Sequence, residues 1–228
     1  WTKPYLNKMK KKIEKDEKLK IAISRLKLKF MKNTDALLHG DLHTGSIMVT
    51  KKDTKVIDPE FAFYGPMGFD TGALIANLLM SYFSQTGHEN KSGERKEYKK
   101  WLLSIIKTIW IEFEKKFLKL WENENHGDAY PKLLFKNNSK KMILEKKEYM
   151  QNLFKETIAY AGAKIIRRIF GFAHNIDFEW IENAKVRANC EYKASKLAIL
   201  MLKDTHSFKS IDDLIKLAKK NEKMKVKF

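Results

Sequence analysis

The residues that bend a protein backbone are concentrated in one short stretch of this chain. Half of its ten glycines and two of its four prolines lie between residues 40 and 72. Glycine and proline mark places where a chain turns sharply or approaches a ligand closely. The rest of the sequence carries mainly helical patterns, so we expect a mainly α (α+β) protein whose irregular part is confined to this stretch.

Apolar residues that recur at three- and four-residue steps predict the helices. The predicted helices cover residues 5–32, 72–84, 94–121, 140–173, 178–203 and 211–222. Asp70 and Thr71 are typical of an N-cap for the second of these helices. Two short apolar strands, 47–50 and 55–57, are joined by a turn at 52–54 and predict a small β-hairpin.

Composition limits the class of protein. The 43% hydrophobic and 12% aromatic content argues for a folded globule and against a disordered chain. No apolar run approaches the roughly 20 residues of a membrane span, and residues 1–20 lack the apolar block of a signal peptide. The single cysteine, Cys190, excludes an internal disulfide and favours a buried structural thiol in a reducing cytoplasm. We therefore expect a cytoplasmic protein with no membrane partner.

The net charge of +18 raises the possibility of a nucleic-acid partner. Only five of the 46 basic residues are arginine, the residue whose planar fork matches phosphates and guanine. The lysines are spread along most of the predicted helices and alternate with glutamates, which is typical of a solvated surface. We therefore favour incidental charge over a polynucleotide site, and a basic nucleic-acid binder stays as an alternative.

Two acidic motifs flank the predicted hairpin. His39-Gly40-Asp41-Leu42-His43 precedes it, and Asp58-Pro59-Glu60 follows it. A His-x-Asp loop, two short strands and a terminal Asp form the layout of a kinase catalytic loop followed by a metal loop. Asp41 would orient the attacking hydroxyl, and Asp58 would hold the magnesium ion. Asp41 could instead only form a turn, but its glycine and histidine flanks favour function.

A metal site is indicated by the second motif. Pro59 separates Asp58 and Glu60, whose carboxylates project to one side of an extended segment and suit Mg²⁺. The alternative is a polar loop in which Asp58 caps a helix. His39 and His43 could suggest zinc, but only two histidines are close and no thiolate is near, so a structural, supporting role is favoured for both.

An arginine pair stands out because this chain otherwise uses lysine. Arg167 and Arg168 lie side by side in an apolar helical pattern. Guanidinium forks hold carboxylate, phosphate or vicinal hydroxyl oxygens bidentately. Adjacent helix positions point about 100° apart, so at most one of the two faces a given target squarely. The alternative is a buried ion pair with Glu or Asp. Asp70 could be only a helix cap, or it could hold the backbone of the catalytic loop.

These residues resemble a known family. His39-Gly-Asp-Leu-His43 is similar to the catalytic loop of the aminoglycoside phosphotransferase and choline kinase group. The longer match, in particular to the methylthioribose kinase family, comprises 39–49, 58–70, 76–79, 127–131 and 167–171. Asp-Pro-Glu in place of Asp-Phe-Gly and the arginine pair are features of that family. The resemblance extends over nearly the whole chain from about residue 25.

The resemblance implies ATP-dependent phosphorylation of the C1 hydroxyl of S-methyl-5-thioribose, with Mg²⁺, to give methylthioribose 1-phosphate in methionine salvage. By that resemblance Asp41 is the catalytic base and contacts the substrate, and Asp58 and Glu60 are metal ligands. Arg167 and Arg168 then serve the sugar and its developing phosphate. Members of the family are typically homodimers.

Two features depart from kinases at large. Ser46 stands where the aminoglycoside group has an asparagine that ligates a second magnesium, so Ser46 is a candidate metal ligand that Glu60 could supplement. We also find no glycine-rich phosphate loop and no strand lysine, and a lobe of about 100 residues does not fit within residues 1–35.

We therefore expect residues 1–228 to form a single kinase-like C-terminal lobe, without the N-terminal lobe. The catalytic and metal loops would occupy 39–72 and a helical subdomain 73–228. On its own such a lobe would have little or no activity. A related aminoglycoside, choline or sugar kinase and a non-catalytic truncated remnant are the alternatives.

Overall fold

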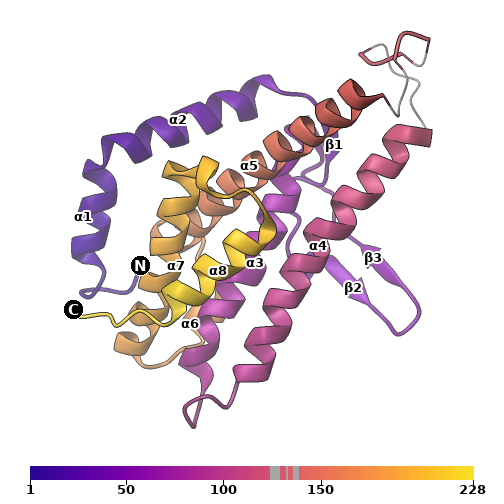
Figure 1. Ribbon diagram of the computed structural model, residues 1–228. Helices are drawn as coiled ribbons and strands as arrows, with labels where there is room; N and C mark the ends of the chain where they lie inside the picture. The colour runs from indigo at the N-terminus through magenta and orange to yellow at the C-terminus, as the bar shows by residue number, and fades with distance from the viewer. Residues whose placement is uncertain (124–128, 132, 136–138) are drawn as a thin grey trace.

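The computed structural model describes residues 1–123, 129–131, 133–135 and 139–228. Helices packed side by side form most of it, and two short β-ribbons lie at one flank (Figure 1). The α-helices are α1 (Asn7–Lys15), α2 (Glu17–Lys32), α3 (Gly68–Ser84), α4 (Lys96–Asn123), α5 (Lys140–Phe170), α6 (Ile176–Glu179), α7 (Ala184–Lys203) and α8 (Ile211–Glu222). Short 3-10 helices are η1 (Thr44–Ser46), η2 (Gln85–His88) and η3 (Thr205–Ser207). The predicted mainly α class is confirmed.

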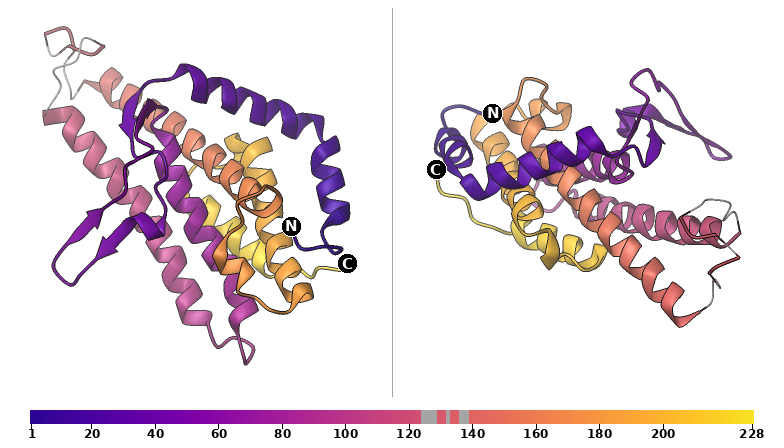
Figure 2. Two further views of the ribbon diagram at one scale, coloured as in Figure 1. Left: turned by 180° about the vertical axis from the view of Figure 1, so that it is seen from behind. Right: turned by 90° about the horizontal axis from the view of Figure 1, so that it is seen from above.

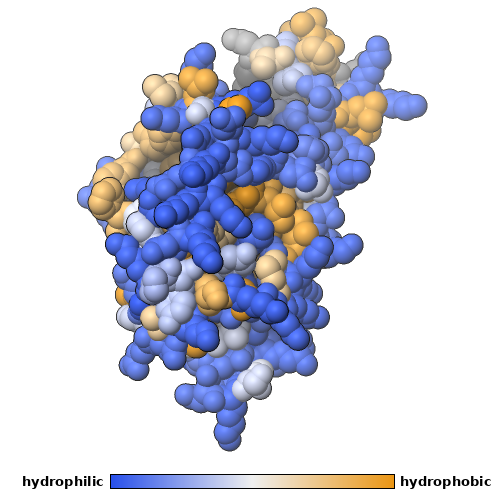
Figure 3. Space-filling view, turned by 90° about the vertical axis from the view of Figure 1, so that its left-hand side faces the viewer, coloured by the Kyte–Doolittle hydropathy of each residue, from blue (hydrophilic) through white to orange (hydrophobic). Residues whose placement is uncertain are grey.

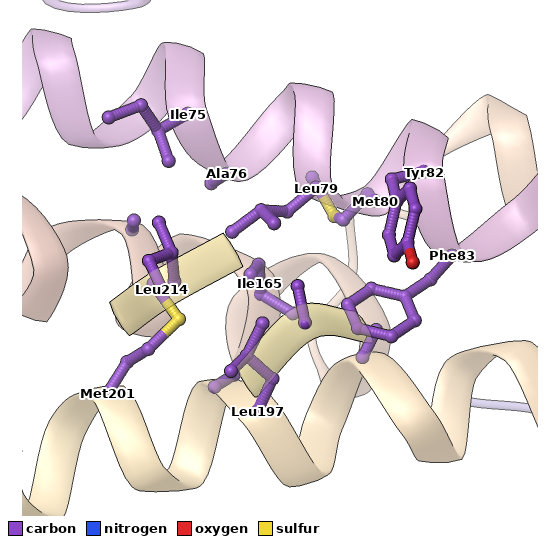
Figure 4. Close-up of a cluster of buried hydrophobic side chains, with 14 of the residues drawn as sticks. Ile75, Ala76, Leu79, Met80, Tyr82, Phe83, Ile165, Leu197, Met201 and Leu214 are labelled. Carbon is purple, nitrogen blue, oxygen red and sulfur yellow. The ribbon is translucent and has the colours of Figure 1, made fainter. Parts of the chain in front are cut away.

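Helix α3 is the centre of the hydrophobic core. It is apolar on nearly all sides, as expected of a helix surrounded by other helices. Figure 4 shows its side chains facing those of α5, α7 and α8. The labelled core residues are Ile75, Ala76, Leu79, Met80, Tyr82 and Phe83 of α3, with Ile165, Leu197, Met201 and Leu214. Burial of these side chains stabilises the arrangement by roughly 1.5–3 kcal/mol for each large residue.

Two glycines allow α3 to lie directly on α5. A Cβ atom at Gly72 would lie 2.7 Å from the backbone oxygen of Thr157, and one at Gly68 would lie 2.8 Å from the Thr157 nitrogen. The Gly68 N–H also donates a hydrogen bond to Oε1 of buried Glu156, at 2.8 Å. The first turn of α3 is therefore fixed against the middle of α5.

Two predicted helices are each interrupted in the structure. The prediction of one helix over 5–32 was wrong, because the backbone is extended at Asp16, whose side chain caps α2 by accepting a hydrogen bond from Leu19 N at 3.0 Å. The prediction over 178–203 was also wrong: α6 ends at Glu179, and Asn183 caps a new helix. Local capping by a short polar side chain outcompeted the apolar periodicity in both places.

The other helix boundaries are closer to expectation. Helix α8 covers the predicted residues, and α4 is displaced by two residues. Helix α5 ends at Phe170, before the predicted 173, because the backbone becomes extended at Gly171, whose N–H makes the last helical hydrogen bond, to the Arg167 carbonyl at 2.9 Å. Helix α3 begins at Gly68 and not at residue 72. Residues 127 and 128, which contribute to the family resemblance, lie outside the described residues.

The predicted hairpin is confirmed, and a second ribbon accompanies it. Strands β2 (Ile47–Val49) and β3 (Thr54–Val56) pair antiparallel and project away from the helices (Figures 1 and 2). Strands β1 (Ala36–Leu38) and β4 (Phe63–Gly65), which the sequence did not predict as a pair, are also antiparallel, with Leu37 opposite Tyr64. This second ribbon brings the two acidic motifs together, because each motif follows or precedes one of its strands.

One face of the molecule is mostly hydrophilic. Figure 3 shows the side of the molecule that lies on the left in Figure 1, where hydrophilic residues cover most of the face and hydrophobic ones occur in patches. Within the described parts of the chain, no helix combines the length and the hydrophobicity needed to cross a membrane. The lysines responsible for the net charge of +18 are thus mostly solvated.

Cys190 is buried in α7, as the sequence predicted. Burial raises the pKa of its thiol to about 11. A thiol that stays protonated at neutral pH is a poor nucleophile, which agrees with a structural role.

The contact between α3 and α5 predicts an unusual result for Gly72→Ala. In an open helix this change would stabilise the protein by about 1 kcal/mol. Here the added methyl group would meet the Thr157 backbone, and we expect a loss of about 1–3 kcal/mol in the free energy of unfolding, measured by urea denaturation. A variant more stable than the wild type would show that the two helices are not in this close contact.

Candidate active site

Asp41 lies in the loop between β1 and η1, where the backbone makes a close internal approach. Gly40 has φ +86°, a left-handed conformation that glycine adopts without strain. A Cβ atom at Gly40 would lie only 2.1 Å from the backbone oxygen of Phe61, in the segment after the second acidic motif. The glycine therefore lets the two acidic loops lie against each other.

Asp70 fastens the backbone of this loop. Its carboxylate accepts hydrogen bonds from the amides of His39, at 2.6 Å, and Gly40, at 3.2 Å. Asp70 lies in the first turn of α3 and is almost buried, while Met67 occupies the N-cap position without a side-chain hydrogen bond. The prediction that Asp70 is an N-cap was wrong. The geometry is that of the other alternative, in which Asp70 holds the loop backbone.

His39 links the two acidic motifs. Its Nε2–H donates to the backbone oxygen of Ile57 at 2.8 Å, next to Asp58. Its Nδ1 accepts a hydrogen bond from the backbone N–H of Asp41 at 3.3 Å. Both bonds require the neutral tautomer protonated on Nε2. His39 is thus engaged on both ring nitrogens with the protein backbone.

His43 turns its ring toward Asp41. Its Nδ1 accepts from Gly45 N at 3.0 Å, and its Nε2 lies 3.7 Å from Oδ2 of Asp41. In the described residues, no three His, Cys, Asp or Glu side chains gather closely enough to hold a metal without other ligands. The nitrogen atoms of both histidines are thus occupied mainly by backbone contacts, which agrees with a supporting role.

The end of the loop is fixed by Ser46 and Asn77. The buried Ser46 hydroxyl donates to the Asp41 carbonyl at 3.2 Å, and the Ser46 carbonyl accepts from Ile57 N at 3.0 Å. Asn77 of α3, which the sequence analysis did not single out, accepts from both the amide and the hydroxyl of Thr44. The hydroxyl that was a candidate metal ligand is therefore already engaged with the loop that carries Asp41.

Lys164 is the charged partner of Asp41, and sequence reasoning missed it. Its Nζ lies 3.1 Å from Oδ1 of Asp41. Burial by itself would raise the pKa of Asp41. The hydrogen bond and charge of Lys164, with the charges of His43 and Arg168, outweigh burial and leave that pKa below its ordinary range. A signal was present in the sequence: Lys164 is a lone lysine among apolar positions of α5, one turn before Arg168.

The two arginines of the predicted pair face different surroundings. Arg168 is half-buried and its charge helps to lower the pKa of Asp41. Arg167 is exposed. Neither forms an ion pair with a carboxylate in the part of the chain that the structure describes, so the alternative of a buried ion pair is not what the fold contains. Both lie in the last turn of α5, where a positive charge also favours the helix dipole.

The second acidic motif is exposed. Among the described residues, Asp58 is the only non-glycine with a positive φ, at 67°. The side chains of Asp58 and Glu60 are exposed, and neither has a hydrogen bond or ion pair within the described ranges. Asp adopts this left-handed backbone conformation more readily than most non-glycine residues. The two carboxylates are free to accept a hard cation.

Comparison with known proteins shows which proteins this chain resembles as a whole. Residues 4–98 match the profile of the phosphotransferase enzyme family (APH). The chain is 48% identical to methylthioribose kinase 1 of Oryza sativa subsp. japonica over 216 residues. This aligned segment covers 94% of this chain and 50% of that protein. It is 41% identical to the methylthioribose kinase of Escherichia coli O45:K1 over 96% of this chain and 52% of that protein.

A second bacterial relative is also similar. The methylthioribose kinase of Geobacillus kaustophilus is 35% identical over 91% of this chain and 48% of that protein. This chain therefore spans about half the length of the curated relatives it matches. The resemblance that the two acidic motifs and the arginine pair indicated is confirmed.

The hydrogen bonds from His39 and Gly40 to Asp70 predict that Asp70→Ala destabilises the protein. Removal of the carboxylate leaves the two amides without their acceptor and should cost about 1–3 kcal/mol in the free energy of unfolding. Hydrogen exchange at the two amides should accelerate as well. Asp212→Ala is a matched control, because Asp212 lies in the first turn of α8 but pairs with Lys107 at the surface; it should change stability by about 0.5 kcal/mol or less. Equal losses in the two variants would contradict the role of Asp70.

Proposed function

We propose that this chain is the kinase-like C-terminal lobe of a methylthioribose kinase. In this proposal the lobe transfers the γ-phosphoryl group of ATP to the C1 hydroxyl of S-methyl-5-thioribose and forms methylthioribose 1-phosphate, a step of methionine salvage. The observation that carries it is the cradle around Asp41, found in a chain 35–48% identical to methylthioribose kinases of plants and bacteria. By the same analogy the full-length enzyme is a cytoplasmic homodimer.

Asp41 would act on the acceptor hydroxyl. Its carboxylate is one-third exposed, so a substrate oxygen can reach it. Neighbouring positive charges outweigh burial and hold the pKa of Asp41 below the ordinary range, so the carboxylate is ionised and orients the acceptor hydroxyl by accepting its hydrogen bond, while the proton passes on to solvent. Positioning and electrostatic stabilisation provide most of the catalysis in phosphoryl transfer. A fixed carboxylate beside the acceptor hydroxyl is the group that this reaction requires.

The donor set after the hairpin fits Mg²⁺. Asp58 and Glu60 offer unpartnered carboxylate oxygens, the ligands that this hard ion prefers, and nucleotide phosphates and water would complete its shell. Bound there, the ion would neutralise charge on the β- and γ-phosphates. Ser46 was also predicted as a ligand. Its buried hydroxyl donates to the Asp41 carbonyl, so we assign it a weaker contribution than the two carboxylates.

Arg168 is the member of the arginine pair that we propose for the sugar and its developing phosphate. It is half-buried on the side of α5 that influences Asp41, and its guanidinium fork has no carboxylate partner among the described residues. Arg167 is exposed and would contribute at longer range. Anionic oxygens held by such a fork gain two parallel hydrogen bonds.

The nucleotide would need further protein groups. This sequence has no glycine-rich phosphate loop and no strand lysine of the kinase type, and it spans about half of its relatives. We propose that residues beyond this sequence bind the β- and γ-phosphates, so that the 228-residue chain alone is weakly active or inactive. Kinases for aminoglycosides, choline or other sugars are the alternative, and a substrate panel separates them.

A coupled ADP-release assay with methylthioribose, ATP and Mg²⁺ tests the proposed function. It should be run on this chain and on a form restored with the upstream coding sequence. We expect turnover only in the restored form, and its loss by at least about a thousandfold in Asp41→Ala. Robust turnover by the isolated chain would contradict the need for further residues. If neither form turns over, another acceptor or a catalytically dead remnant becomes the better explanation.

Separate substitutions of the two arginines test their assignment. Arg168→Ala removes charge-assisted hydrogen bonds worth about 1.5–3 kcal/mol, so kcat/KM for methylthioribose should fall by roughly 10- to 150-fold. Arg167→Ala is the matched control and should have a much smaller effect, because that side chain is exposed. A larger loss in Arg167→Ala would reverse the assignment.

A further inference from the structure

Lys164 is a buried cation, and apolar packing alone does not explain why a charged side chain occupies this position. Its side chain is 9% exposed and lies near the C-terminal end of α5, where the neighbouring positions, Ile165 and Ile166, are buried and apolar. An ammonium group removed from water costs several kcal/mol unless it is paired. A lysine retained at such a position must therefore gain from specific partners.

The partners of Lys164 are few. Its Nζ lies 3.1 Å from Oδ1 of Asp41 and 5.5 Å from the centre of the Phe69 ring, a cation–π distance. The other charges that act on it are Arg167 and Arg168, both of the same sign. Burial, which is the largest influence, and these two arginines lower the pKa of Lys164, and Asp41 opposes them. Within the described residues Asp41 is its one anionic partner.

Lys164 uses only one of the two carboxylate oxygens of Asp41. Oδ1 accepts its hydrogen bond, whereas Oδ2 lies 3.7 Å from Nε2 of His43, beyond normal hydrogen-bond length. The carboxylate is one-third exposed. One oxygen is thus tied to α5, and the other keeps room for a further donor.

We propose that Lys164 is the positioning residue of the phosphoryl transfer, which fixes one oxygen of Asp41 so that the other meets the acceptor hydroxyl. The proposal rests on the proposed function. As the acceptor oxygen forms its bond to the γ-phosphorus, the bond from that phosphorus to the bridging oxygen breaks, and ADP leaves with the electron pair. The acceptor proton passes to Oδ2 of Asp41 and from there to solvent.

A structural reading competes with this one. Lys164 could simply neutralise Asp41 and support α5, without any effect on the reaction. The two readings differ in a double-mutant cycle, because a residue that acts through Asp41 has nothing left to position once Asp41 is replaced. They also differ in how much kcat and KM change relative to each other.

The chain contains a matched control. Lys146 is another buried lysine of α5, 7% exposed at its side chain. It also pairs with a carboxylate, that of Glu122 at 3.4 Å, and lies 5.9 Å from the centre of an aromatic ring, Trp121. Lys146→Met therefore reproduces the loss of a buried cation, an ion pair and a ring contact on the same helix, away from Asp41.

The kinetic experiment compares Lys164→Met, Lys164→Gln and Lys146→Met in the form restored with the upstream sequence. We expect Lys164→Met to lower kcat roughly a hundredfold with little change in KM for ATP. Lys164→Gln keeps an N–H donor and should retain more activity, and it serves in its place if Lys164→Met does not fold. Lys146→Met should leave kcat unchanged. In the Asp41→Asn background, Lys164→Met should cause no further loss.

A spectroscopic arm makes the result independent of turnover. The carboxyl ¹³C resonance of Asp41, assigned by its absence in Asp41→Asn, should move in Lys164→Met and stay in Lys146→Met. If the wild type shows no turnover while this resonance moves, the proposed function fails but the pairing stands. An unmoved resonance, a full additional loss in the double mutant or equal losses in the Lys164 and Lys146 variants would overturn the positioning role.

Discussion

The close packing of α3 on α5 is the contact on which the site depends. Gly68 and Gly72 let the two backbones approach to a distance that no side chain would permit. Helix α3 contributes Asp70, which holds the loop backbone, and α5 contributes Lys164, which holds the Asp41 side chain. Two helices therefore hold the acidic loop, and the packing of the core fixes the position of one helix relative to the other. Because the core is closely packed, the geometry of the loop is rigid as well.

The electrostatics of the site follow from the same arrangement. Asp41 is partly withdrawn from water, which alone would disfavour its charge, but three basic side chains from the loop and α5 surround it. In the described residues Asp41 pairs with Lys164, and the guanidinium of Arg168 has no carboxylate partner. A site of this kind favours an anionic ligand, and a phosphoryl group moving between two oxygens brings several negative charges at once.

Much of this could be predicted from the sequence, and the failures have a common origin. The hairpin and helix α8 follow from local periodicity, and the spacing of the motifs makes Asp41 and Asp58 candidate site residues; both signals are properties of short segments. The helices break after Lys15 and Glu179 because one polar side chain caps a new helix in each place. Such a cap contributes about 1 kcal/mol, and the spacing of apolar residues carries no information about it. The β1–β4 pair, the contacts of Asp70 and the pairing of Lys164 join residues more than 20 positions apart. The local sequence around each of these residues does not identify the distant residue with which it pairs.

The two acidic motifs precede and follow the exposed hairpin and are held in place by different numbers of contacts. A two-stranded ribbon has little stability of its own, and nearly every residue of β2 and β3 faces solvent. Asp41 lies on the side of the ribbon that is anchored to the helices, whereas Asp58 follows its outgoing strand and is tethered chiefly through Ile57. Local opening should therefore reach Asp58 before it reaches Asp41. Under the proposed function, the part of the site that meets the acceptor would therefore be ordered before any ligand arrives, and the part that holds the cation would take its final form around the nucleotide.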